Sequence, residues 1–293
     1  MEFINPTTDY AFKKIFGSDQ SKDILISFLN ALIYEGHATI QDLEIINPNL
    51  PPKVEGLKDS SLDVKARLDN GTIVIIEMQV LNVESFGKRV IFNAAKTYAF
   101  QLKRKEGYSM LKPVIAVTVA NFQMFPGYDH YLSRFQFQEV TTHYKHPDRT
   151  IELIFIELPK FNKPVAELET LTEKWIAFMK EAELFDAIPT NMEDIPEFNQ
   201  AFEIANRAHL SRAEIEAIER QEMFIYDQQG SLNLSRREGL EEGRAEGRAE
   251  GREEGYKESK REIARQLLGQ MEIEAIATLT GLTVAEVQAL QGD

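Results

Sequence analysis

The sequence predicts an α/β fold in which a mixed central sheet is flanked by helices and followed by a helical C-terminal extension. Residues 1–160 alternate between the apolar spacing of helices and the apolar runs of strands. Residues 161–235 show helical spacing only, residues 236–262 carry a Glu-Gly-Arg repeat, and residues 263–293 form a short apolar tail. We therefore expect an α/β domain, a helical region, a charged helix or linker, and a small helical tail.

Composition narrows the class of protein. The 293 residues carry 47 acidic and 33 basic side chains, and the net charge of −14 argues against a general nucleic-acid coat or a binder of anionic membranes. The net charge does not exclude a locally basic groove, because it averages over the whole surface. The 43% hydrophobic content excludes wholesale disorder, and the absence of cysteine excludes disulfides, thiolate metal sites and thiol nucleophiles. No apolar run approaches the roughly 18 residues of a membrane helix, so we expect a soluble, cytoplasmic protein without membrane contact.

The N-terminal segment predicts two helices, a strand and a loop. The first helix runs from Asp9 to Gly17, with an apolar face at helical spacing, and the second starts at about Ser21. Residues 43–46 predict a short strand. Three prolines and a glycine make residues 47–60 a loop.

A β-hairpin is predicted next. Every second side chain of residues 62–68 is apolar, which indicates a half-buried strand. Asp69-Asn70-Gly71 is a strong turn signal. Residues 72–80 are apolar on both faces, as expected of a central strand, and should pair antiparallel with the first strand.

The rest of the α/β domain predicts a helix and two strands. The helix covers residues 85–105, and the strands cover residues 114–119 and 151–158. The aromatic-rich segment 121–150 holds three of the five histidines and is left unassigned. The histidines have no metal-ligand spacing.

Two carboxylates face each other across the predicted hairpin. With a three-residue turn, partner numbers sum to 140, so Asp63 lies opposite Glu77 with Cβ atoms about 5 Å apart, and Gln79 points to the same face. Two carboxylates at that separation repel by about 3 kcal/mol, which a divalent cation such as Mg²⁺ or Mn²⁺ reverses. A structural alternative, in which Glu77 pairs with Lys65 or Arg67 near the sheet edge, stays open.

The order of these motifs resembles the PD-(D/E)xK nuclease superfamily, in which an acidic residue precedes a hairpin turn, Glu-x-Lys follows on a central strand, and a helix comes next. More narrowly, the chain is similar to the bacterial recombination-promoting nuclease and transposase-like family. The similarity covers nearly the whole chain and rests on Asp9-Tyr10-Ala11-Phe12-Lys13-Lys14-Ile15-Phe16-Gly17, Leu62-Asp63-Val64, Ile76-Glu77-Met78-Gln79, Lys88-Arg89-Val90, Tyr98, the Glu-Gly-Arg run and Thr280-Gly281-Leu282-Thr283.

The resemblance implies a restriction-endonuclease-like core and a magnesium-dependent endonuclease that cuts double-stranded DNA and promotes recombination. It makes Asp63 and Glu77 the metal ligands and places Gln79 where the family motif has its final residue, usually lysine. Glutamine carries no charge, so the transition state must be stabilised by another group or less strongly.

Other groups near the motif can supply the missing charge. Arg89 and Lys96 fall on one stripe of the helix after the hairpin, together with Asn93, and either cation could replace the motif lysine. Lys13, one turn after Asp9, is a further candidate. Asp9 itself is either a third acidic group or a first-turn residue favoured by the helix dipole. A solvated helix face remains the alternative for Arg89 and Lys96.

Three classes of function follow. The first is the metal-dependent DNA endonuclease. The second is a catalytically weakened nuclease fold that acts as a DNA-associated or regulatory binding module, which the absent lysine and the acidic composition favour. The third is a carboxylate-pair hydrolase acting on a non-nucleic substrate, for which neighbouring cations suit phosphate better than sugar.

The C-terminal extension suggests self-association. In the repeat, identical residues recur every four positions, which stacks like charges, and five glycines further weaken an isolated helix. A homodimer through residues 236–293 would relieve both defects, whereas a flexible linker is the alternative. Residues 273–287 predict a helix, a glycine turn and a helix, similar to a helix-turn-helix, but residues 272–293 contain no lysine or arginine for phosphate contacts.

Overall fold

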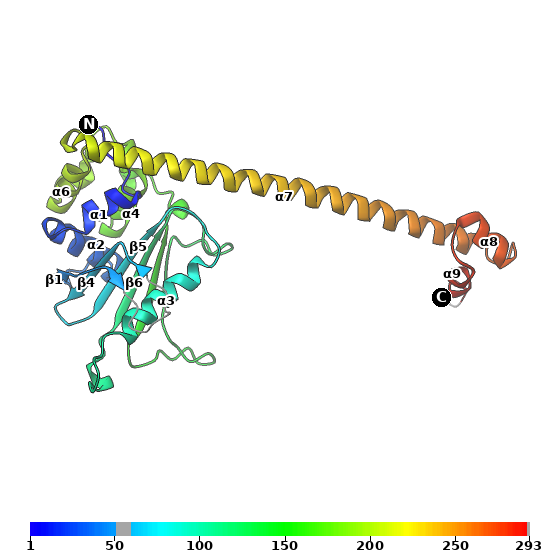
Figure 1. Ribbon diagram of the computed structural model, residues 1–293, viewed down its shortest axis with the longest axis horizontal. Coiled ribbons are helices and arrows are strands. Elements are labelled where there is room, and N and C mark those ends of the chain that lie inside the picture. The colour runs from blue at the N-terminus through cyan, green and yellow to red at the C-terminus, as the bar shows by residue number, and fades with distance from the viewer. Residues whose placement is uncertain (51–59, 292–293) are drawn as a thin grey trace. The chain divides into compact units, whose positions relative to one another are not determined.

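The computed structural model describes residues 1–50 and 60–291. Six strands form the central sheet, namely β1 (Leu43–Ile45), β4 (Val64–Leu68), β5 (Ile73–Gln79), β6 (Val114–Ala120), β7 (Leu132–Phe135) and β8 (Ile151–Glu157). Their order is β1-β4-β5-β6-β8-β7 (Figure 1). The central strands β5, β6 and β8 are parallel, whereas β1, β4 and β7 pair antiparallel with their neighbours. The predicted mixed sheet is confirmed.

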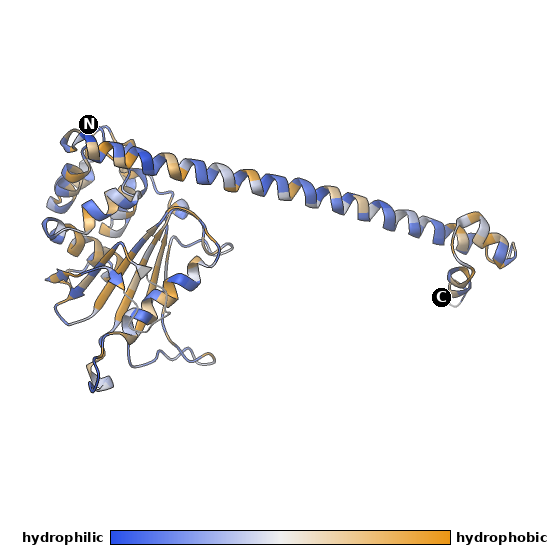
Figure 2. Cartoon of the chain, in the orientation of Figure 1, coloured by the Kyte–Doolittle hydropathy of each residue, from blue (hydrophilic) through white to orange (hydrophobic). Residues whose placement is uncertain are grey.

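The β4–β5 hairpin has the predicted register. Val64 lies opposite Ile76 and Arg67 opposite Ile73, so the numbers of partners sum to 140. Gly71 closes the turn at φ +87°, a backbone conformation that favours glycine. Because β5 lies between β4 and β6, its apolar side chains are buried on both faces, and the sheet strands are largely orange in Figure 2.

Helices cover both faces of the sheet. One face packs against α1 (Asp9–Phe16), α2 (Lys22–Tyr34), α4 (Leu171–Glu181) and α6 (Pro196–Ala205), whose aromatic side chains form a common core. The other face packs against α3 (Phe86–Ala99). Alternate residues of β5 supply the two cores, with Val74 and Ile76 in the first and Ile73 and Ile75 in the second. The domain therefore has three layers, with helices on either side of the sheet.

Two local predictions differ from the structure, and a segment left unassigned contains a strand. The helix predicted over 85–105 ends at Ala99, because the Gln101 side chain hydrogen-bonds both the amide and the carbonyl of Lys112, at 2.9 and 2.8 Å, and turns the chain toward β6. The loop predicted over 47–60 includes two short paired strands, β2 (Asn49–Leu50) and β3 (Ser60–Ser61), and its residues 51–59 lie outside the described residues. The unassigned segment 121–150 contains β7.

The loop between β6 and β7 is held by a buried ion pair. Glu157, at the end of β8, is fully buried and accepts hydrogen bonds from the backbone amides of Met124 and Phe125 at 2.5 and 3.1 Å. Lys160 contacts the same carboxylate at 2.7 Å and donates to two carbonyls of the loop. This pair fixes the chain that follows β6.

Residues 161–235 form helices, as predicted, and residues 236–262, expected as a helix or a flexible linker, are also helical. Besides α4 and α6, the helices are α5 (Thr190–Glu193), α7 (Arg212–Leu267), α8 (Ile273–Thr280) and α9 (Val284–Ala289). The first turns of α7 contact α1, since Glu214 accepts hydrogen bonds from Tyr10 at 2.7 Å and from Lys14. Residues 228–293 form a second compact unit. None of the helices in the described part of the chain has an apolar stretch long enough to cross a bilayer.

The second unit contains the repeat and the tail. The Glu-Gly-Arg repeat is helical within α7, and the space beside each of its glycines is open. The end of α7 packs against α8 and α9 around Ile276 and Val287. Gly281 ends α8 in the left-handed conformation at φ +67°, and Thr283 with Glu286 forms a capping box at the start of α9. The predicted helix–glycine turn–helix tail is confirmed.

Candidate active site

The candidate site lies at one edge of the sheet. Glu77 and Gln79 come at the carboxyl end of β5, and Asp63 directly precedes β4, which runs antiparallel to β5. The paired register ends at Val64 opposite Ile76, and Asp63 and Glu77 are the residues that follow this pair on either side. Along β5, Glu77 and Gln79 alternate with Ile76 and Met78, which face the other core, so both polar residues lie on the side of the sheet that α3 covers.

Asp63 is a largely buried carboxylate whose nearest cation lies at 3.5 Å. Its side chain is 15% exposed, Oδ2 accepts a hydrogen bond from the Met78 amide at 2.7 Å, and Oδ1 lies 3.5 Å from Lys13 Nζ. Lys13 is held more closely by Asp9, at 2.6 Å, and Asp9 also hydrogen-bonds to Asp63. Burial raises the pKa of Asp63 to about 7, a rise that the Met78 amide and Lys13 oppose and Asp9 reinforces.

Glu77 is buried to the same extent but has a stronger partner. Its side chain is 14% exposed, and Oε1 lies 3.0 Å from a guanidinium nitrogen of Arg89. Burial raises the pKa of Glu77, while the charge of Arg89 and hydrogen bonds from Asn93 and Arg89 lower it. Arg89 is 42% exposed and also donates to Gln79 Oε1 at 2.6 Å. Gln79 in turn donates to the Leu81 carbonyl at 2.8 Å.

The structure gathers most of the predicted site residues into two groups, one around Asp63 and one around Glu77. Asp9 and Lys13 of α1 contact Asp63, while Arg89 of α3 links Glu77 to Gln79. Lys96, two turns beyond Arg89, is instead buried and donates to the Leu50 carbonyl at 2.6 Å. The catalytic and metal-binding roles assigned to these residues stay predictions.

Two further groups of the site were not assigned by sequence reasoning. Asn93 donates to Glu77, and its position one helical turn after Arg89 was the available signal. The Met78 amide, which holds Asp63, is a backbone group and has no sequence signal. Of the two alternative partners proposed for Glu77, Arg67 pairs instead with Glu44 at 2.9 Å.

The donor set fits a hard divalent cation. Carboxylate oxygens are the ligands that Mg²⁺ and Mn²⁺ prefer, and burial makes both carboxylates unfavourable as anions unless a cation compensates them. No group of three or more acidic or histidine side chains that could hold a metal ion occurs within residues 1–50 and 60–291. Two carboxylates still suit Mg²⁺, because it usually keeps several waters and binds through one or two carboxylates plus substrate phosphate.

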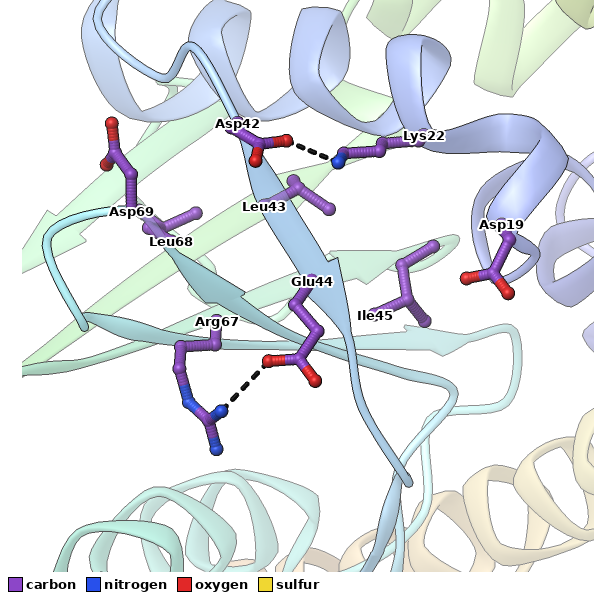
Figure 3. A pocket seen from close by; sticks show the side chains of 9 residues that line it. All are labelled: Asp19, Lys22, Asp42, Leu43, Glu44, Ile45, Arg67, Leu68 and Asp69. Carbon is purple, nitrogen blue, oxygen red and sulfur yellow. Dashed lines mark hydrogen bonds and ion pairs between the residues drawn. The ribbon is translucent and has the colours of Figure 1, made fainter.

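A separate hollow of about 520 Å³ lies over β1 and β4 (Figure 3), and neither Asp63 nor Glu77 lines it. Its two cations are occupied by its own acids, Lys22 by Asp42 and Arg67 by Glu44. Asp19 and Asp69 add two further negative charges. A surface with four acids and two paired cations does not suit a polyanionic substrate, so this hollow is not a candidate nucleic-acid site.

Comparison with known proteins supports the family. No curated protein and no solved structure matches the chain. Residues 6–235, which include the whole sheet, the carboxylate pair and α3, match the family model of the PD-(D/E)XK nuclease family transposase. The sheet and its flanking helices agree with that match. The chain therefore belongs to the PD-(D/E)XK nuclease family of transposases.

Proposed function

We propose that this protein is a magnesium-dependent DNA endonuclease whose metal ligands are Asp63 and Glu77, with Mn²⁺ as an alternative cofactor. The observation that carries the proposal is that two largely buried carboxylates, Asp63 and Glu77, come at the same end of the β4–β5 hairpin, each with a raised pKa. Family membership supports nuclease chemistry, and the two-carboxylate donor set supports a hard cation. Double-stranded DNA is the proposed substrate, and recombination in the cytoplasm is the proposed setting.

The residues around the pair would position the reaction. A divalent cation bound by the two carboxylates would polarise the phosphodiester and lower the pKa of a bound water. The Met78 amide orients Asp63, and Asn93 together with Arg89 orients Glu77. Arg89 is also exposed enough to reach a phosphate oxygen, so it can supply the charge that Gln79 lacks.

A specific observation favours the second candidate, a catalytically weakened DNA-associated or regulatory module. Both ends of the Gln79 amide are engaged, Oε1 by Arg89 and Nε2 by the Leu81 carbonyl. In this arrangement Gln79 has no group directed to a water or a phosphate. Cleavage would then depend on Arg89 moving toward the substrate.

A plasmid nicking assay distinguishes the two. We expect the parent to convert supercoiled DNA to nicked or linear forms with Mg²⁺ or Mn²⁺ and not with EDTA. Asp63→Ala and Glu77→Ala should abolish cutting, while Asp129→Ala, a change of the same type at an exposed position, should not alter it. DNA binding without cutting by the parent would support the binding module. Cutting by all three variants at the parental rate would overturn the metal-site assignment.

The repeat supports a homodimer, which would let one assembly cut both strands. A glutamate precedes each glycine of the repeat, and an arginine follows most of them, for example in Glu246-Gly247-Arg248. If two parallel helices met along the glycine face, the glutamates of one would lie beside the arginines of the other. Sedimentation of the full chain over a range of concentrations tests this. A purely monomeric chain at all concentrations would dispose of the dimer.

A further inference from the structure

Charge is distributed unevenly over the two faces of the α/β domain. Residues 84–112, which contain α3 and the loop that leads to β6, hold seven basic and two acidic residues in a chain whose net charge is −14. Residues 161–210, which supply α4 and α6 on the other face of the sheet, hold four basic and ten acidic residues. The helical segments that cover the two faces of the sheet therefore have opposite net charge.

The excess of positive charge on the α3 side remains when every cation with a partner is left out. Arg89 pairs with Glu77, Lys96 is buried against the Leu50 carbonyl, and Lys112 lies against the β4–β5 turn, which also carries Asp69. The four remaining cations are exposed and have no ion-pair partner in the described part of the chain, and they are Lys88, Lys103, Arg104 and Lys105. The two acids of the segment are Glu84 and Glu106, so the balance stays positive.

The outer side of α3 is open to a large partner. The helix lies on the outside of the sheet (Figure 1), and Lys88, Phe92, Ala95 and Ala99 form an exposed stripe along it at the spacing of one helix face. Phe92 is 42% exposed, and its neighbour Ile91 is 56% exposed. Because Ala95 and Ala99 end at Cβ, a partner can approach the helix closely along its second half. We call the outer side of α3 together with residues 100–106 the α3 surface.

The unpaired cations of the α3 surface lie in two groups, one at each end of the helix. Lys88 is in the first turn of α3, next to Arg89, which contacts Glu77. Lys103, Arg104 and Lys105 follow the end of the helix. From Lys88 to Ala99 the helix rises about 17 Å. That length corresponds to about five base-pair steps of a DNA duplex, so one duplex can contact both groups while a phosphate lies near Glu77.

We propose that the α3 surface binds the phosphate backbone of the DNA duplex, and the proposal rests on the proposed nuclease function at Asp63 and Glu77. Lys88 contacts phosphates close to the cut, and the cations at residues 103–105 contact phosphates about half a helical turn away. Contacts of lysine and arginine with phosphates give affinity without reading sequence, so binding depends strongly on salt and little on sequence. The acidic α4 and α6 side repels the duplex and directs it to α3.

Fluorescence anisotropy of a labelled duplex in EDTA, repeated over a range of salt concentrations, measures binding apart from cleavage. We expect Lys88→Glu and Arg104→Glu each to weaken binding about tenfold and to lower the slope of log affinity against log salt by about one. Glutamate is favoured in the first turn of a helix, so Lys88→Glu should leave the fold intact. The matched control is Lys174→Glu, the same change in the first turn of α4 on the acidic side, which should stay within about twofold of the parent.

A single introduced thiol tests where the duplex lies, because the chain contains no cysteine. Ala95→Cys places the thiol on the exposed stripe of α3 between the two groups of cations. Saturating duplex should slow its reaction with a maleimide by about fivefold and should leave Lys174→Cys unaffected. Equal rates for Ala95→Cys with and without bound duplex would overturn the α3 surface.

The outcomes separate this surface from the nuclease proposal. If the parent nicks plasmid but Lys88→Glu and Arg104→Glu bind the duplex as tightly as Lys174→Glu, the surface is wrong and the nuclease stands. If both variants bind more weakly but the parent cuts nothing with Mg²⁺ or Mn²⁺, the nuclease fails and the α3 surface belongs to a DNA-binding module. Competition by poly-glutamate as effective as that by unlabelled duplex would assign the surface to an acidic polypeptide and overturn the proposal.

Discussion

Replacing Asp63 with asparagine tests whether the buried carboxylate exists for a cation or for stability. Asparagine keeps the size of the side chain and an oxygen that can accept the Met78 amide, but it carries no charge. If the Asp63 carboxylate stabilises the fold, replacing it should lower the free energy of unfolding. If it serves instead to bind a metal, replacing it with a neutral group should raise the free energy of unfolding of the metal-free protein.

The expected gain follows from the pKa of Asp63, which burial raises from 3.8 to about 7. The folded state binds this proton more tightly than the unfolded chain does, so the wild-type protein loses stability as pH rises from about 4 to about 7. At about 1.4 kcal/mol per pH unit, the charged form costs the fold about 4 kcal/mol at pH 8. We expect Asp63→Asn to be more stable by about 2–4 kcal/mol in EDTA.

Urea unfolding at several pH values measures this difference. The advantage of Asp63→Asn should be constant above pH 7 and should shrink by about 1.4 kcal/mol per pH unit below it. Asp129→Asn, the same change at an exposed position, should show no such trend. Mg²⁺ at ten times its dissociation constant should add about 1.4 kcal/mol to the wild type and not to Asp63→Asn. A variant less stable than the wild type at pH 8, or a pH-independent difference, would refute the reasoning.

Three other substitutions test separate parts of the structure. Arg89→Met removes the guanidinium shared by the second carboxylate and the neighbouring amide, and plasmid nicking should slow by about 100-fold, less for Arg89→Lys. Lys160→Met leaves the buried Glu157 without its counter-ion and should cost about 3–5 kcal/mol in urea unfolding; adding Glu157→Gln should recover part of the loss. Glu214, whose pKa is lowered mainly by its hydrogen bond from Lys14, stabilises the fold only when ionised. Glu214→Gln should therefore cost about 1–2 kcal/mol at pH 7, and the difference should disappear as pH falls below about 4.5 toward the lowered pKa. An equal difference at pH 3 and pH 7 would contradict that assignment, and Glu216→Gln on the exposed face of α7 serves as its control.

The hairpin could be predicted in detail because its signals are local. The Asp69-Asn70-Gly71 turn fixes the loop length, and alternation along residues 62–68 fixes which side chains share a face. Those two facts set the register, which is confirmed from Val64 opposite Ile76 to Arg67 opposite Ile73. That Asp63 and Glu77 come at the same end of this hairpin was therefore readable from about fifteen consecutive residues.

The segment 121–150 could not be assigned because its structure depends on side chains and not on turn residues. Gln138 pairs with Lys145 across a tight bend, yet the bend contains neither glycine nor proline. Instead the Glu139 side chain accepts hydrogen bonds from the amides of Thr141 and Thr142, and His143 adopts φ +57°. An Asx-like turn built by a glutamate has no strong sequence signature.

The partners of the two carboxylates were the least predictable part of the site, because each comes from another element. Lys13 is 50 positions from Asp63 in the sequence, and only the packing of α1 beside the sheet brings the two together. Arg89 and Lys96 lie on one stripe of α3 and looked equivalent as replacements for the motif lysine. The two short strands near Leu50 separate them, since they give Lys96 a carbonyl to bind while Arg89 remains beside Glu77.

The neutral Gln79 is consistent with a site whose positive charge comes from the helix and not from the strand. Arg89 bonds to the carboxylate of Glu77 and to the amide of Gln79 at once, so it lies beside the position that the motif lysine would occupy. Its guanidinium stays charged at any pH that the fold tolerates, whereas a lysine beside two buried carboxylates would compete with a metal for both. An arginine anchored on α3 holds one oxygen of one carboxylate and leaves Asp63 to its weak contact with Lys13. In the proposed reaction, moving the charge from strand to helix would keep a cation near the phosphate, and that cation pairs with Glu77 and not with both carboxylates.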